Sequence, residues 1–289
     1  MCQPNGLPYH EHLVYEYFVV KLAVEGLVFD LTKPPESIGI TLHFDGPQPN
    51  HFGADVAVAK PMRSGDFIGD TQQGGSCNAE DVYLNPHCNG THTESISHII
   101  DEVIAPFEVI KQALVLAQVV TVTPESDYTG SDSYQPALEK SDKVIGKHML
   151  TTVLKDLHEG VKALIIRTLP NDEDKKTYQY GGEVQPPFFT NDAMQWLAES
   201  TEIEHLLVDM PSVDRLYDDG LLSNHRLFWN VAAGCHQLKG TPHTHNTLTD
   251  MAYIPQGIKD GTYLLNLQTP KLKLNAVPSH PVIYHPETN

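Results

Sequence analysis

The 289-residue sequence predicts an α/β fold, and three consecutive segments carry this prediction. The segment "GVKALIIRTLPN" (160–171) is largely apolar and predicts a buried strand that opens into a loop. The segment "TNDAMQWLAES" (190–200) predicts a helix, with Thr190 or Asn191 as its N-cap. A second buried strand is predicted directly afterwards in "IEHLLVDMPS" (203–212). Strand, helix and strand in this order predict a βαβ crossover from about Leu164 to Asp209.

Further elements are predicted along the chain from the same kinds of pattern. Segment 13–31 alternates apolar and polar residues and predicts strands with a turn at Gly26. Segment 38–46 predicts another strand. Apolar residues at helical spacing in 96–114 predict a helix, and the β-branched run 115–123 predicts a strand after it. Segment 232–246 predicts an irregular loop.

The composition favours a protein with a large core and a strongly acidic surface. Hydrophobic residues make up 40% of the chain, and 37 acidic against 19 basic residues give a formal net charge of −18. Such a surface repels phosphate backbones and anionic lipids, so neither nucleic acid nor a membrane is an expected partner. No repeat or low-complexity linker divides the chain, and residues 1–289 are therefore predicted to form a single domain.

The N-terminal and cysteine patterns favour a reducing compartment. The N-terminal segment has no basic leader region, and charges such as Glu16, Lys21 and Glu25 interrupt its apolar runs. We therefore expect neither a signal peptide nor a membrane span. The four cysteines are spread too widely to form a disulfide framework. The expected location is the cytoplasm.

The segment "NPHCNGTHTESISHI" (85–99) concentrates groups that bind metals. Cys88, His92, Glu94 and His98 share even numbers, which places them on one face if the segment is extended. Thiolate, imidazole and carboxylate are all Zn²⁺ ligands, and a carboxylate can also bridge to a second ion. Gly90 allows the backbone to bend between them. The segment therefore predicts a metal site.

Three alternatives stand beside this interpretation. The segment also fits a solvated loop with hydrogen-bonded imidazoles. A second alternative makes Cys88 a nucleophile with a histidine as its base. A third keeps the metal site but shifts its register, so that His87 replaces Cys88 as the first ligand.

The segment "GTHTESISH" resembles the signature of the cyclase family of metal-dependent hydrolases, which includes bacterial kynurenine formamidase and isatin hydrolase. That signature runs His-x-x-x-His-x-Asp, with Gly-Thr before the second His, a Pro two residues after the Asp and a further His two beyond. Later segments also resemble the family, in order: "FFTNDAMQWLAES", "HLLVDMPSVDR", "LLSNHRLFW" and "LTDMAYIPQGIKDGTYLLNLQTPKL". The resemblance extends from near Asp66 to near Tyr284. It implies a central mixed, partly barrel-like sheet flanked by helices, of the swivelling β/α type.

The resemblance also implies roles for individual residues. Cys88, His92 and Glu94 would hold a first metal, with His98 as general base, and His225 and Asp250 would complete a second metal position. The chain departs from the family at three signature positions, which carry Cys88, Glu94 and Ile96 instead of His, Asp and Pro, and Asp250 stands where Glu is usual. Because a thiolate is a soft ligand, we expect one or two Zn²⁺ ions rather than Mn²⁺.

The activity that the resemblance implies is hydrolysis of an amide C–N bond, in an aryl formamide such as N-formylkynurenine or in a cyclic amide. One alternative is a cyclase or dehydratase reaction on the same scaffold. Another is a protein that binds a metal or a small acid without catalysis. A homo-oligomer, either a dimer or a tetramer, is expected by the same resemblance.

Other polar and aromatic residues carry weaker signals. Asp209 and Asp214 follow the second buried strand, where they either contribute to a site or shape a turn. Phe188, Phe189, Phe228 and Trp229 are expected to pack in the core rather than to line a pocket. Three further histidines in the 232–246 loop are expected to be solvated: His236, His243 and His245.

Overall fold

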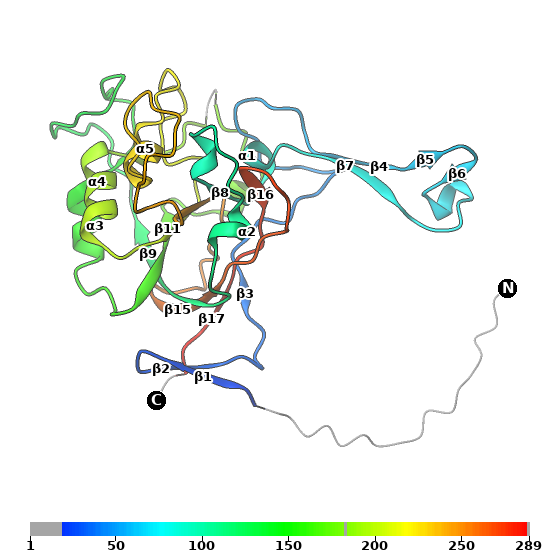
Figure 1. Cartoon of the computed structure of the whole chain (residues 1–289), viewed down its shortest axis with the longest axis horizontal. Helices are drawn as coiled ribbons and strands as arrows, with labels where there is room; N and C mark the ends of the chain where they lie inside the picture. Colours follow the sequence, from blue (N-terminus) through cyan, green and yellow to red (C-terminus); the bar gives the residue numbers. More distant parts are fainter. Residues whose placement is uncertain (1–18, 182–183, 288–289) are drawn as a thin grey trace.

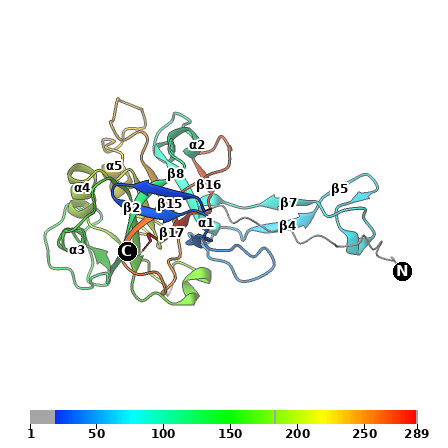
Figure 2. The same ribbon diagram turned by 90° about the horizontal axis from the view of Figure 1, so that it is seen from below.

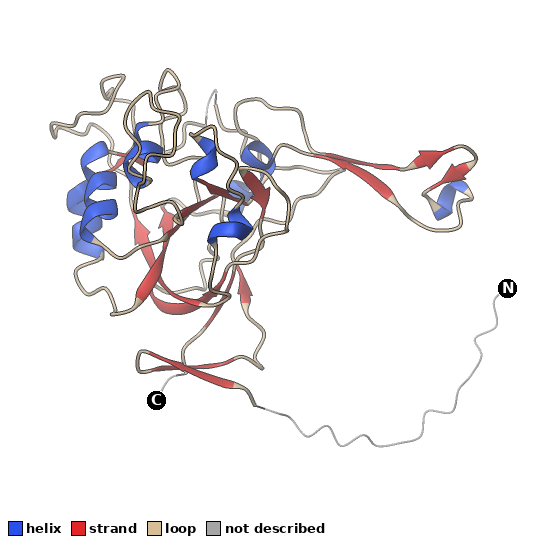
Figure 3. Ribbon diagram, viewed as in Figure 1, coloured by secondary structure: helices blue, strands red, loops and turns tan. Residues whose placement is uncertain are grey.

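The structure, a computed structural model, describes residues 19–181 and 184–287 (Figure 1). Nine strands form its main sheet: β3 Glu36–Ser37, β8 His92–Ser95, β9 Val115–Val122, β11 Val161–Thr168, β13 His205–Val208, β14 Thr247–Asp250, β15 Gly261–Asn266, β16 Ala276–Pro278 and β17 Val282–Tyr284. Their spatial order is β16-β8-β14-β13-β11-β9-β15-β17-β3. The sheet curls into a half-barrel, which confirms the predicted α/β class with a mixed, partly barrel-like sheet (Figure 3).

The middle of the sheet is parallel and its two flanks are antiparallel. Strands β14, β13, β11 and β9 are parallel neighbours, and every other pairing is antiparallel. The predicted βαβ crossover is confirmed, because Leu164 of β11 pairs with Leu206 of β13 and helix α4 (Asn191–Ser200) connects the two strands. Thr190 is the N-cap residue of this helix. The carboxyl ends of the parallel strands meet at one edge, where α/β proteins usually carry function.

The helices are few and short, and α3 and α4 cover one face of the sheet (Figure 3). Leu164 and Ile166 of β11 pack on this face, whereas Ile165 points into a second apolar cluster with Ile254 on the opposite face. Side chains alternate along a strand, so one apolar run fills both clusters. The other helices and 3₁₀ turns are α1 Pro86–Asn89, α2 Pro106–Val109, α3 Lys147–Val153, α5 Ser223–Phe228, η1 Thr71–Gln73, η2 Ile96–His98 and η3 Glu173–Thr177.

The predicted N-terminal hairpin is present in the described part of segment 13–31. Strands β1 (Lys21–Val24) and β2 (Leu27–Asp30) pair around Glu25 and Gly26, which both have positive φ angles of 45° and 80°. That turn conformation matches the twist of a tight hairpin. Residues 13–18 lie outside the described residues. Strand β9 and the irregular 232–246 segment also agree with the sequence predictions.

Two predicted elements are wrong. Segment 38–46 contains only an isolated bridge at Gly39 instead of a strand. Segment 96–114 contains η2 and the four-residue α2 instead of one helix. Ser97 explains part of this second error, because its side chain donates to the carbonyl of Glu102 and accepts from the amide of Ile104. These bonds replace helical ones, and Pro106 prevents a helix from continuing across it.

A two-stranded arm projects from the main body (Figures 1 and 2). Strands β4 (Val58–Pro61) and β7 (Glu80–Tyr83) pair antiparallel along it, and β5 (Arg63–Ser64), β6 (Phe67–Ile68) and η1 lie at its tip. All four residues of β7 are exposed. A further short parallel pair joins β10 (Val144–Ile145) to β12 (Phe188–Phe189). Among the described residues, no helix has the length and apolar character to cross a membrane.

Candidate metal centre

Strand β8 places polar side chains in the interior of the sheet. It pairs with β14 on one side and with β16 on the other, and all four of its residues are buried. Its register sets Asp250 of β14 opposite His92, and it lets the hydroxyls of Thr93 and Thr249 hydrogen bond at 2.8 Å. Burial of a histidine and a glutamate costs free energy unless each finds a partner. Their partners come from other segments.

Glu94 lies at the centre of three imidazole rings. Its Oε2 atom is 3.1 Å from Nδ1 of His87 and 3.9 Å from Nδ1 of His98, and its Oε1 atom is 3.0 Å from Nε2 of His225. Helix α1 supplies His87, the turn after β8 supplies His98, and α5 supplies His225. Residues far apart in the sequence thus meet at one carboxylate.

These side chains form two overlapping sets of metal-ligand atoms. In one set, atoms of His87, His92 and Glu94 lie within 4.8 Å of one another, and in the other, atoms of Glu94, His98 and His225 do. Glu94 belongs to both sets, as a bridging carboxylate would. His87 and His98 are each 25% exposed, so the centre can be reached from their side. Imidazole and carboxylate sets of this kind suit Zn²⁺ and other divalent transition metals.

Four of the predicted site residues come together here, namely His92, Glu94, His98 and His225. Cys88 does not, because its thiol belongs to neither set of ligand atoms formed by the described residues. The even-number argument assumed an extended chain at residue 88, and this assumption is wrong: residues 86–89 form the helical turn α1. A helix rotates successive side chains by about 100°, so His87 and Cys88 point in different directions. The geometry matches the alternative register.

Asp250 lies beside the centre but outside both ligand sets. Its Oδ2 atom is 3.7 Å from Nε2 of His92. The Oδ1 atom of Asp250 and the Nε2 atom of His92 are both buried without a hydrogen-bond partner in the described structure. Unpartnered buried polar atoms are uncommon and costly, and a cation is a natural partner for a carboxylate and a neutral imidazole. The donor set therefore fits a metal ion.

The electrostatics of the centre keep several donor atoms free of protons. Burial lowers the pKa of His92 to about 3 and that of His98 to about 4, so both rings are neutral at pH 7. Burial alone would raise the pKa of Glu94, but His98 and hydrogen bonds from His225 and His87 hold it well below its usual value. Burial and the nearby charge of Glu94 raise the pKa of Asp250 well above its usual value. Metal binding requires neutral imidazoles and ionised carboxylates. The shifts at His92, His98 and Glu94 favour these states, whereas the raised pKa of Asp250 opposes ionisation of that carboxyl.

Asp214 orients His225 from behind. Its Oδ2 atom is 2.6 Å from Nδ1 of His225, and it also accepts from the backbone amides of Asn224 and His225 and from the hydroxyl of Tyr134. Hydrogen bonds to Asp214 and Glu94 raise the pKa of His225 well above its usual value, although burial opposes this. A carboxylate behind a metal-binding imidazole is a recurrent supporting arrangement. The sequence indicated only a turn or a possible site at Asp214, because the contact with His225 depends on the fold.

The remaining polar residues that the sequence singled out lie elsewhere. Asp209 pairs with Lys175 at 2.7 Å. In the 232–246 loop, His236 contacts the carbonyl of Ile99 and His243 contacts Asn246. Neither histidine belongs to the two ligand sets. The four aromatic residues expected to pack in the core are all buried, although Phe188 also lines a cavity: Phe188, Phe189, Phe228 and Trp229.

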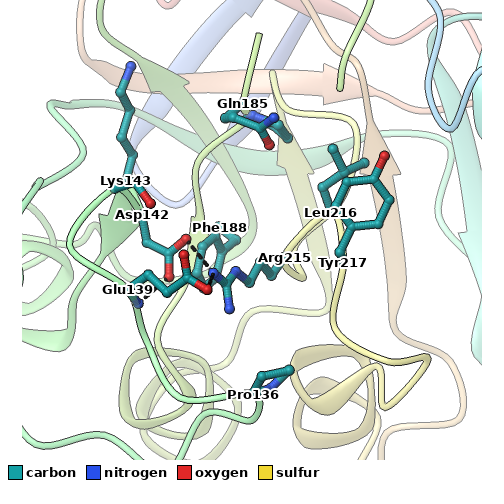
Figure 4. Close-up of a pocket in the computed structure, with 11 residues that line it drawn as sticks. Pro136, Glu139, Asp142, Lys143, Gln185, Phe188, Arg215, Leu216 and Tyr217 are labelled. Atoms are coloured by element: carbon teal, nitrogen blue, oxygen red, sulfur yellow. Dashed lines mark hydrogen bonds and ion pairs between the residues drawn. The ribbon is translucent and has the colours of Figure 1, made fainter. Parts of the chain in front are cut away.

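A cavity of about 440 Å³ lies beside Arg215, the residue that follows Asp214 (Figure 4). The backbone amide of Arg215 in its wall donates to the Tyr134 hydroxyl that also contacts Asp214. The guanidinium of Arg215 pairs with Asp142 at 3.0 Å and with Glu139 at 3.3 Å, as the dashed lines show. Its charge is therefore already matched. None of the residues that line this cavity belongs to the metal-ligand sets.

The chain belongs to the Cyclase family, whose model matches residues 19–215. This match confirms the resemblance seen in the sequence. It includes His87, His92, Glu94 and His98 but ends before His225 and Asp250.

Solved structures with the same fold include metal-dependent hydrolases. An isatin hydrolase bound to the product analogue thioisatinate has a TM-score of 0.58 and 16% identity, over 88% of this chain and 92% of that one. Isatin hydrolase A from Labrenzia aggregata bound to benzyl benzoate has a TM-score of 0.57 and 14% identity, over 88% and 94%. A predicted metal-dependent hydrolase from Bacillus stearothermophilus has 0.56 and 14%, over 87% and 98%. Identities this low show a shared fold. Comparison with curated proteins gave no match.

Proposed function

We propose that the protein is a metal-dependent hydrolase that cleaves the C–N bond of an aryl formamide or of a cyclic amide. The observation that carries this proposal is Glu94, a buried carboxylate shared by two sets of imidazole ligands. The fold is that of metal-dependent hydrolases, which supports the reaction class. Amide carbonyls resist water strongly, so an electrophile beside a proton acceptor is a suitable pairing for them.

The metal in this proposal is Zn²⁺, held by His87, His92 and Glu94, and His225, whose Nε2 atom lies 3.0 Å from Glu94, would share a second ion with this carboxylate. Bound there, the ion supplies Lewis acidity that polarises a carbonyl and lowers the pKa of water. With Cys88 outside the ligand sets, thiolate softness no longer argues against Mn²⁺. Our preference for Zn²⁺ then rests on the histidine-rich donor set, and the experiment below includes both metals.

His98 is proposed to move the proton. It is neutral at pH 7 and partly exposed, and it lies beside Glu94, so it can accept a proton from the attacking water. In the formamide reaction, the water oxygen adds to the formyl carbon and the C–N bond breaks. The proton passes to the departing nitrogen, which gives formate and an aryl amine. In a cyclic amide the same cleavage opens the ring to an amine and a carboxylate.

The experiment loads the apoprotein with Zn²⁺ or Mn²⁺ and measures bound metal per chain together with hydrolysis of formanilide and isatin. We expect about one or two ions per chain and turnover that chelators abolish. His87→Ala should remove most of the metal, whereas the neighbouring Cys88→Ala is the matched control and should keep it. His98→Ala should retain metal and lose at least about 100-fold in kcat, as expected for a proton-transfer residue.

Four outcomes would contradict parts of this proposal. Less than about a tenth of an ion per chain, without chelators, argues against the metal centre itself. Loss of metal in Cys88→Ala but not in His87→Ala restores the other register. Loss of metal in His98→Ala makes this residue a ligand rather than the base. Full metal content without turnover of either amide would indicate a protein that binds metal but does not hydrolyse these substrates.

A further inference from the structure

His51 is a buried histidine that the metal centre does not account for. Its residue exposure is only 2%, yet neither ring nitrogen has a hydrogen-bond partner in the described structure. A neutral imidazole carries one N–H donor and one lone pair, so both of its polar functions are buried without a partner. Native proteins rarely leave such groups unmatched, and an exception calls for an explanation.

The surroundings place His51 next to the metal centre. Its backbone amide donates to the carbonyl of Cys88 at 3.0 Å, which attaches it to the helical turn that carries His87. On its other side, Asn50 exchanges backbone hydrogen bonds with Tyr178 and Tyr180. His51 is thereby held between two segments.

Aromatic groups enclose the ring of His51. Phe52 covers it, with ring centroids 4.0 Å apart, and adopts a left-handed backbone (φ 57°) that is uncommon for a bulky residue. Tyr180 presents its edge at 6.5 Å and also lines a cavity of about 230 Å³. The lining of this cavity combines apolar and charged residues: Leu169, Pro170, Pro186, Pro187 and Met210 are apolar, and Lys143, Lys175 and Asp209 are charged. Tyr180 thus contacts both the ring of His51 and a cavity with room for an aromatic ring.

We propose that His51 is a specificity-determining residue, which donates a hydrogen bond to a ketone oxygen on the substrate's aromatic ring, ortho to the amide nitrogen. This inference rests on the proposed hydrolase function. Isatin and N-formylkynurenine share that arrangement, in which an aryl ketone stands beside the carbon that bears the amide nitrogen. A buried N–H without another partner rewards a ligand that accepts from it and penalises one that does not.

The test compares two formamides that differ only in this ketone, 2′-formamidoacetophenone and formanilide. The ratio of their kcat/KM values is measured for the Zn²⁺-loaded wild type and for His51→Phe, which keeps an aromatic ring but removes the donor. Because both substrates are assayed on each protein, their difference in intrinsic reactivity cancels. We expect the preference for the ketone to fall at least about tenfold in the variant, as for the loss of one hydrogen bond.

Three further variants control the result. His43→Phe makes the same substitution at an exposed histidine of the same N-terminal region and should leave the ratio unchanged. His51→Asn keeps an N–H donor and should recover part of the preference. His51→Leu serves as a second apolar variant if the phenylalanine does not fit. Bound metal per chain and the melting temperature should stay at the wild-type values in His51→Asn. A change in substrate preference could then not be explained by damage to the metal site.

The outcomes separate this inference from the proposed function. If formamides are hydrolysed with the same ratio in wild type and in the apolar variants, the hydrolase stands and the role of His51 is overturned. If the wild type hydrolyses neither compound, the recognition role of His51 is tested by calorimetry of 2′-aminoacetophenone binding to the metal-loaded protein. Binding at least about tenfold weaker in His51→Phe keeps the recognition role. Equal affinity, or no binding to the wild type, overturns it.

Discussion

Strands β7 and β8 have the same length and lie close together in the sequence, yet their side chains have opposite environments. Residues Glu80–Tyr83 of β7 are all exposed, including Val82 at 51% and Tyr83 at 63%. Residues His92–Ser95 of β8 are all buried, although each of them is polar. Hydrophobicity alone would place β7, which contains Val82 and Tyr83, in the interior and the wholly polar β8 at the surface. The difference is one of position, because β7 has a single partner strand in the arm and β8 lies between two strands of the main sheet.

The comparison shows where the fold is organised for function. The buried polar groups of β8 find partners from α1, α5 and β14, and Glu94 alone meets three imidazoles. Such an arrangement is costly to assemble and offers little stability over an apolar core of the same volume. We infer that its value lies in the metal site. In contrast, β7 sits in a two-stranded ribbon, which has marginal stability by itself.

The largest expected effect is a loss of Zn²⁺ affinity when Glu is changed to Gln in β8, and the same substitution in β7 serves for comparison. Glu94→Gln in β8 keeps the side-chain volume but removes the charge that both ligand sets share. We expect Zn²⁺ affinity to fall at least about 100-fold, which exceeds the usual effect of losing a supporting residue. The stabilisation of the protein by added Zn²⁺, measured as a rise in melting temperature, should disappear with it.

Glu80→Gln in β7 is the matched control for this variant. Glu80 is exposed at the start of β7, on the side of the arm's tip, so its loss should leave both metal affinity and melting temperature close to wild type. If Glu94→Gln bound Zn²⁺ as tightly as Glu80→Gln, the buried carboxylate would have no part in metal binding. The contrast between the strands would then be one of packing alone.

The sequence predicted the parts of this picture that depend on local periodicity. The alternation argument holds for His92 and Glu94 because β8 is extended, and it is wrong at Cys88 because α1 is helical. A helical turn of four residues has too few positions to show a period. The contact between Glu94 and His225 was expected only through the family resemblance, since no local pattern links residues so far apart. His51 was missed, because burial without a partner is a property of the folded chain.

The next effect concerns His205, a buried polar residue of β13 in the same sheet. Its Nδ1 atom contacts the hydroxyl of Thr247 at 2.9 Å, and burial lowers its pKa to about 4. The unfolded chain, with a histidine pKa of about 6.5, binds a proton between pH 6.5 and 4 that the folded protein does not. Stability is therefore lost as the pH falls through this window, by up to about 1.4 kcal/mol per pH unit.

The variant His205→Gln should remove this contribution, so that its free energy of unfolding depends less steeply on pH between 6.5 and 4. Urea unfolding at several pH values measures the difference in slope from the wild type. His148→Gln, at an exposed histidine of α3, is the control and should keep the wild-type slope. Parallel curves for wild type and His205→Gln would mean that His205 accepts its proton equally well in both states.

The smallest expected effect returns to the arm. Val82→Ala should change the free energy of unfolding by less than about 0.5 kcal/mol, because the side chain is half exposed and is already hydrated in the folded protein. Val277→Ala is the matched change in β16, where the residue is fully buried opposite Thr93 of β8, and it should cost on the order of 2 kcal/mol. Urea unfolding at a low and a high protein concentration measures both. A cost above about 1 kcal/mol for Val82→Ala that grows with protein concentration would show that another copy of the chain covers the arm, since only an intermolecular contact depends on concentration.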